Sequence, residues 1–232
     1  ILFYSGLPPQ HMWGFAIASM LLEAIYFILL CIAYTDHDFS LVYPIARGAA
    51  PALLVLWSAI FLREQLTVGG YIGLAMITGG IILIGATTLL QNKGEKPHLK
   101  GILTALSVAL VISIYTFIDG TAVKNGPALP YGISMFVMVP FVTTPYLMNR
   151  YGIEPFKRVW KNYRGYLLIG GVLGLVAYML ALFAYTIAPL SYSGAIREVS
   201  AVIGAFLGWR FLKEEMGGIR LVGSVIVFAG VM

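Results

Sequence analysis

The tetrapeptide Phe61-Leu62-Arg63-Glu64 recurs 150 residues later as Phe211-Leu212-Lys213-Glu214. The same offset relates three further pairs of residues, namely Arg47 and Arg197, Gly73 and Gly223, and Gly80 and Gly230. Because one constant spacing holds over this length, we interpret the chain as two copies of one unit. A repeat of this kind in an apolar chain is typical of secondary transporters.

The composition places the chain in a membrane. Apolar residues make up 59% of it and charged residues 11%, whereas soluble domains carry about 25% charged residues. Runs near the roughly 20 apolar residues that span a bilayer occur at 12–34, 38–62, 66–90, 101–120, 129–149, 165–188, 189–212 and 217–232. We therefore expect an all-α multi-pass membrane protein with about eight helices in this chain, the last of them clipped.

The repeat also predicts how the two copies are oriented. Arg47 falls in the second of these runs and Arg197 in the seventh, so five crossings separate the two residues. An odd number of crossings turns the second copy upside down relative to the first. Residues 1–90 would form an incomplete first repeat and residues 101–232 a second repeat of five helices. Two helices would then precede Ile1, and the parent fold would have ten.

The basic residues give an independent prediction of topology. The net charge is +5, and eleven of the fifteen Lys and Arg residues fall in three short loops, at 91–100, 150–164 and 210–220. Two crossings separate each of these loops from the next, so all three lie on one face. The positive-inside rule places that face in the cytoplasm and the C-terminus outside. This pattern is typical of membrane topology rather than of nucleic-acid binding.

The two copies resemble the EamA domain of the bacterial drug/metabolite transporter superfamily. The residues that carry the resemblance are Ser40-Leu41-Val42-Tyr43-Pro44-Ile45-Ala46-Arg47-Gly48, Pro51, Phe61-Leu62-Arg63-Glu64, Ala188-Pro189-Leu190-Ser191, Arg197, Leu212-Lys213-Glu214 and Gly223. The resemblance implies ten helices in two inverted five-helix halves and transport of amino acids, sugars, nucleotide precursors or toxic compounds. It also implies that the protein is no enzyme and lies in the bacterial inner membrane. Relatives of this kind have both termini in the cytoplasm, which disagrees with the charge pattern, so absolute orientation stays open.

Arg47 is the first candidate for a transport residue. It lies about nine residues into its run, roughly 14 Å deep at 1.5 Å per residue, with Tyr43 one turn earlier on the same face. Pro51 cannot donate to the carbonyl of Arg47, so a kink and an unsatisfied carbonyl are expected there. A charge at this depth costs about 2.5 to 3.5 kcal/mol, which indicates either a cavity that binds substrate or a buried ion pair.

Arg197 repeats this arrangement, with Ser193 one turn earlier and Ala201 where the first copy has Pro51. Glu198 lies about 100° around the helix from Arg197, so it would line a cavity or join an interhelical salt bridge. Two arginines favour a cargo with a carboxylate or phosphate, although Glu23 or Glu198 could neutralise them.

Two acidic residues complete the candidates. Glu23 lies near the middle of its run, and it is the best candidate for a carboxylate that binds and releases a proton. Asp119 lies at the end of its run beside Gly120, where we expect either a helix terminus at the membrane interface or a transport residue.

These residues predict a secondary carrier that works by alternating access and exports a small polar metabolite, amino acid or drug-like compound. A carrier of phosphorylated or isoprenoid-linked sugar is the alternative, and an intramembrane lipid-modifying enzyme is a weaker one, because His11, His37 and His98 lie in separate loops. No metal or nucleotide motif occurs, and we expect no cofactor. A proton is the candidate coupling ion, and a homodimer is an open alternative to a monomer.

Overall fold

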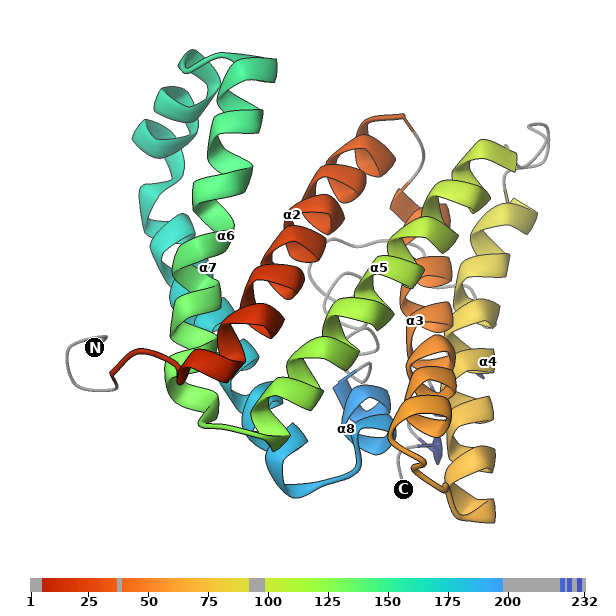
Figure 1. The fold of residues 1–232 in the computed structure, drawn as a ribbon. Coiled ribbons are helices and arrows are strands. Elements are labelled where there is room, and N and C mark those ends of the chain that lie inside the picture. The colour runs from red at the N-terminus through yellow and green to blue at the C-terminus, as the bar shows by residue number, and fades with distance from the viewer. Residues whose placement is uncertain are drawn as a thin grey trace. The chain divides into compact units, whose positions relative to one another are not determined.

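The computed structural model describes residues 6–36, 39–91, 99–197, 222–223, 225–226 and 229–230. Within these residues every regular element is helical. A short 3₁₀ turn, η1 (Gln10–Met12), precedes α2 (Trp13–Asp36), α3 (Phe39–Phe61), α4 (Val68–Gln91), α5 (Leu99–Lys124), α6 (Ala128–Tyr151), α7 (Glu154–Ile187) and α8 (Leu190–Arg197) (Figure 1).

The expected all-α multi-pass fold is confirmed. Four segments of the described part of the chain are long and apolar enough to cross a membrane, namely Gln10–Ala33, Lys100–Lys124, Ala128–Tyr151 and Glu154–Ile187. Helices α2 to α6 match the apolar runs to within a few residues. Two further runs are expected at 189–212 and 217–232, and most of their residues fall outside the described part of the chain.

Helix α7 begins eleven residues earlier than the sequence predicts, so the expected loop at 150–164 is wrong. Only Gly152 and Ile153 separate α6 from α7, and Gly152 has a φ of 76°, a left-handed conformation that favours glycine. Glu154 and Pro155 suit the first helical turn, because that turn favours an acidic side chain and needs fewer N–H donors. Lys157 also pairs with Glu154 at 2.8 Å.

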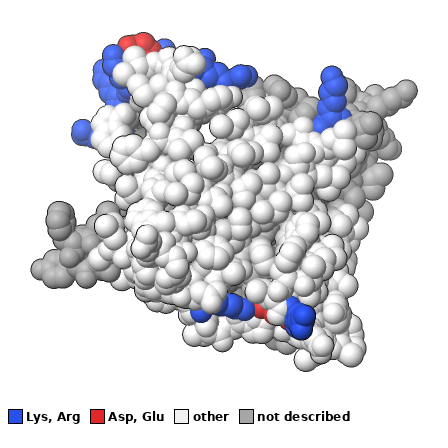
Figure 2. Space-filling model, in the orientation of Figure 1, with Lys and Arg blue, Asp and Glu red and all other residues white. Residues whose placement is uncertain are grey.

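The length of α7 explains how a basic segment can be helical in a membrane protein. Its 34 residues extend for about 51 Å at 1.5 Å per residue, which exceeds the roughly 30 Å of hydrocarbon in a bilayer. Its first turns can therefore lie beyond the hydrocarbon. Figure 2 shows Lys and Arg side chains gathered at the end of the α6–α7 hairpin, with an uncharged surface along the rest of it.

The chain divides into two compact units, of which unit 1 comprises residues 1–27 and 118–188. In it, α6 and α7 form a hairpin (Figure 1). The two helices approach closely at Gly132. A Cβ at this position would meet the side chains of Met179 and Leu182. The 3₁₀ turn η1 packs on the α5–α6 turn, where His11 Nε2 and the Asn125 carbonyl oxygen lie 3.1 Å apart.

Unit 2 comprises residues 28–117 and 189–232. Helices α3 and α4 form its main hairpin, and α8 packs against both (Figure 1). A Cβ at Gly194 of α8 would meet the Leu54 side chain, so the small residue permits the close approach of α8 to α3. Trp57 of α3 donates its indole N–H to Ser113 Oγ of α5 at 3.0 Å.

Candidate transport site

Asp119 joins four helices of unit 1. Its side chain is 1% exposed, and its carboxylate accepts hydrogen bonds from residues on α2, α6 and α7. Ser19 and Tyr131 donate to Oδ1, the latter at 2.7 Å, and Tyr178 donates to Oδ2 at 2.9 Å. Three hydroxyl donors satisfy much of what a buried carboxylate requires, and this offsets the cost of removing it from water.

This placement corrects the expectation of an interfacial helix terminus at Asp119. Helix α5 continues to Lys124, and the side chain is buried rather than at the end of a span. The apolar run ends at residue 120 by composition, but the backbone remains helical for another turn. The partners Tyr131 and Tyr178 were not among the residues singled out from the sequence, where their only signal is a hydroxyl inside an apolar run.

A cavity of about 330 Å³ lies in the same unit. This volume is at the lower end of the range of roughly 300 to 1,000 Å³ that is usual for small-molecule sites. Its polar lining residues are Glu23 and Tyr178, and the latter connects the cavity wall to Asp119. The remaining lining residues are apolar: Phe27, Met135, Phe136, Val139, Pro140 and Gly174.

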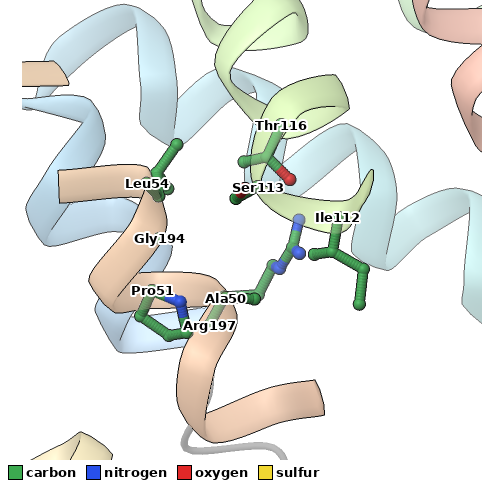
Figure 3. A pocket seen from close by; sticks show the side chains of 8 residues that line it. All are labelled: Ala50, Pro51, Leu54, Ile112, Ser113, Thr116, Gly194 and Arg197. Atoms are coloured by element: carbon green, nitrogen blue, oxygen red, sulfur yellow. The ribbon is translucent and has the colours of Figure 1, made fainter. Parts of the chain in front are cut away.

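The second pocket belongs to unit 2 and contains Arg197. Figure 3 shows the Arg197 side chain entering the pocket, with its guanidinium directed toward Ser113 and Thr116 on α5. The volume is about 10 Å³, which is close to the space that one water molecule needs. Pro51 also lines this pocket, and α3 continues as a helix on both sides of it.

The sequence-predicted residues are thus divided between the two units. Glu23 and Asp119 lie in unit 1, whereas Arg47, Ser193 and Arg197 lie in unit 2. In unit 2, Arg47 is half-buried on α3 and Ser193 is buried on α8. The side chain of Tyr43 and all of Glu198 fall outside the residues that the structure describes.

Tyr26 and Phe27 follow Glu23 on α2, and the centroids of their rings are 5.1 Å apart. Among the described residues, no group of three or more His, Cys, Asp or Glu side chains could hold a metal ion. What the described arrangement offers is a carboxylate and a phenol on a largely apolar cavity.

Comparisons with known proteins agree with a transport protein. The model of the EamA-like transporter family matches residues 99–232. A solved crystal structure of a protein with 16% sequence identity has the same fold, with a TM-score of 0.73 over 94% of this chain and 75% of that chain. None of the curated proteins matches the sequence. Since the family model covers more than half of the chain, this multi-pass membrane protein belongs to the EamA-like transporter family.

Proposed function

We propose that the protein is a secondary carrier of the bacterial inner membrane that exports a small polar metabolite, amino acid or drug-like compound. The observation that supports this most directly is the cavity of about 330 Å³ in unit 1, which carries Glu23 and Tyr178 on otherwise apolar walls. An acidic side chain in an apolar span is costly and therefore usually has a function. In a transporter, that function is contact with the cargo or with a coupling ion.

The mechanism we propose is alternating access. The two inverted copies inferred from the 150-residue offset would exchange conformations and expose the cavity first to one face of the membrane and then to the other. The carboxylate of Glu23 would bind a proton in one state and release it in the other. Efflux would then use the proton gradient across the membrane.

The arginines have a separate place in this proposal. Arg197 lines a pocket with room for about one water molecule in this conformation, so it would contact a cargo only after that pocket has widened. A phosphorylated or isoprenoid-linked sugar is the alternative cargo that Arg47 and Arg197 would favour, because guanidinium groups bind phosphate in bidentate fashion.

Transport by reconstituted protein tests the proposal. Proteoliposomes loaded with labelled amino acids, amines or sugar phosphates should release at least one of these classes faster than protein-free liposomes loaded with the same solutes. Arg47→Ala and Arg197→Ala should each lower that flux at least tenfold. Arg158→Ala is the matched control, because it removes an arginine from the exposed start of α7 and should leave flux unchanged. Full flux in both arginine variants would remove Arg47 and Arg197 from the transport path, and no flux of any solute would refute the carrier itself.

A further inference from the structure

We infer that the start of α7 binds the headgroups of anionic phospholipids through a basic–aromatic patch made of Trp160, Lys161, Tyr163 and Arg164. This binding is independent of the proposed carrier function, because it requires only that α7 spans a membrane. Its support comes from the depth of the four residues, their arrangement around the helix and their exposure.

The patch lies at the level of the lipid headgroups. Residues 167–187 of α7 include no charged residue, and they extend for about 31 Å at 1.5 Å per residue. This length matches the roughly 30 Å of hydrocarbon in a bilayer, beyond which each headgroup layer adds about 5 to 8 Å. The patch precedes Leu167 by three to seven residues, or about 4 to 11 Å along the helix axis. Its side chains therefore reach the headgroup layer.

The basic and the aromatic side chains of the patch occupy adjoining faces of α7. At about 100° per residue, Lys161 and Arg164 are about 60° apart, and the same angle separates Trp160 from Tyr163. Arg164 follows Trp160 by one turn, so the two faces adjoin. The cations are placed to bind a lipid phosphate by charge-assisted hydrogen bonds. The aromatic rings suit the boundary between hydrocarbon and water, where Trp and Tyr are enriched.

No other part of the protein covers this patch. All α7 residues from Glu154 to Gly174 are exposed, and Trp160 and Tyr163 are each 55% exposed. Figure 2 shows Lys and Arg side chains gathered at this end of the α6–α7 hairpin.

The charge of this end of the hairpin favours an anionic partner. Residues 150–164 include five basic residues and one acidic residue, Glu154, which pairs with Lys157. Lys and Arg clusters beside a membrane span are typical of binding to anionic lipid, because the negative surface potential attracts them. A zwitterionic headgroup carries no net charge, so the patch should discriminate against it.

Arg158 provides a matched comparison within the same helix. It lies about 160° around α7 from Trp160, and it precedes Leu167 by about 14 Å. Both its face and its depth therefore place it outside the patch, although it is exposed as Lys161 and Arg164 are.

Phosphatidylglycerol and phosphatidylcholine with identical oleoyl chains test the preference for an anionic headgroup. The affinity of the purified full chain for each lipid is measured by native mass spectrometry, and thermal unfolding is followed by circular dichroism in neutral detergent. We expect phosphatidylglycerol to bind about tenfold more tightly or better, and to raise the Tm more than phosphatidylcholine does. That difference in Tm should shrink between about 0.05 and 0.5 M NaCl, because salt screens exposed charges. Equal affinities for the two lipids would overturn the proposal.

Variants then assign the preference to the patch. Lys161→Ala and Arg164→Ala should each weaken phosphatidylglycerol binding about fivefold, which is the usual contribution of one cation near an anionic surface. Binding of phosphatidylcholine should stay within twofold. Lys161→Arg keeps the charge and should keep the affinity. Arg158→Ala is the control, since it removes the same charge and should leave phosphatidylglycerol binding within twofold of the parent. Equal effects of Lys161→Ala, Arg164→Ala and Arg158→Ala would refute the patch as the binding site.

Glycerophosphoglycerol, the headgroup of phosphatidylglycerol without its acyl chains, separates a lipid site from a site for soluble phosphate esters. At the concentration at which phosphatidylglycerol raises the Tm, this probe should leave the Tm unchanged. The same rise with glycerophosphoglycerol would show that the patch binds a soluble anion rather than a membrane lipid. None of these measurements uses a transported solute, so loss of the lipid site would leave the proposed carrier standing, and absence of transport would leave the lipid site standing.

Discussion

Ser191 donates its hydroxyl to Glu64 Oε2 at 2.8 Å, and its backbone N–H donates to the same oxygen at 3.2 Å. The other carboxylate oxygen accepts the N–H of Leu190 at 2.9 Å. Glu64 follows the end of α3 and lies 127 positions before Ser191 in the sequence. Its carboxylate accepts hydrogen bonds from N–H groups at the start of α8, which have no partner within that helix. These bonds are those of a helix cap.

Removal of this cap should destabilise unit 2. We expect Glu64→Ala to lower the free energy of unfolding by about 1 to 2 kcal/mol, which is the usual effect of losing a helix cap. The measurement is SDS-induced unfolding in detergent, followed by circular dichroism. The neighbouring exposed Gln65 provides the control, and Gln65→Ala should change the free energy by less than about 0.5 kcal/mol. Equal stability of the two variants would show that the cap does not hold α8.

Gly73 and Gly230 allow two backbones of unit 2 to touch. A Cβ at Gly73 would lie 2.6 Å from the Gly230 carbonyl oxygen, and a Cβ at Gly230 would lie 2.7 Å from that of Gly73. Because backbone atoms cannot move aside as side chains do, Gly73→Ala should lower the free energy of unfolding by about 1 to 3 kcal/mol. Gly79 lies on the same helix with open space around it, and Gly79→Ala should leave stability unchanged or slightly raised in the same unfolding experiment.

The inverted relation that we infer from the 150-residue offset predicts a second contact. Inversion of the two copies exchanges Gly73 with Gly223 and Gly230 with Gly80, so it requires Gly80 to approach Gly223 as Gly73 approaches Gly230. Both Gly80 and Gly223 are buried. Gly80→Ala should therefore destabilise the protein by about as much as Gly73→Ala, in contrast to Gly79→Ala at the adjacent position. Stability of Gly80→Ala equal to that of Gly79→Ala would contradict the inverted relation.

Asp119 should matter more for stability than any single partner. Asp119→Ala leaves the hydroxyls of Ser19, Tyr131 and Tyr178 without their common acceptor. We expect a loss of about 3 kcal/mol or more, because each buried donor left unsatisfied costs about 1 to 3 kcal/mol. Tyr178→Phe removes one donor and leaves the carboxylate two others, so its loss should be about 1 kcal/mol. Similar losses in the two variants, measured by unfolding in detergent, would mean that Asp119 does not organise the cluster.

The helices were predictable from the sequence because the length of an apolar run is a local property. The bilayer requires about 20 apolar residues in a span, and the ends of α3 and α4 follow that rule. The start of α7 was not predictable in this way. Residues 154–164 are polar and basic, and hydropathy cannot distinguish a polar helix beyond the bilayer from a loop.

The candidate site was predictable only in part, and the reason is again physical. Glu23 and Asp119 could be singled out because charges in apolar runs are costly. The meeting of Tyr131 and Tyr178 at Asp119 depends on how three helices pack, and no periodicity along a single helix encodes it. The repeat relates Arg47 to Arg197 by sequence position, whereas the α3 residues that line the described pocket with Arg197 are Ala50, Pro51 and Leu54.

Glu23 should determine how transport responds to pH. If its carboxylate binds a proton in one conformation and releases it in the other, flux of the cargo should rise when a pH gradient is imposed on proteoliposomes. Glu23→Gln cannot exchange a proton, so its remaining flux should be the same with and without the gradient, while counterflow without a gradient should persist. Glu154→Gln, which removes an exposed carboxylate, should keep the response of the parent protein. A response of Glu23→Gln equal to that of the parent would show that a group other than Glu23 binds the coupling proton.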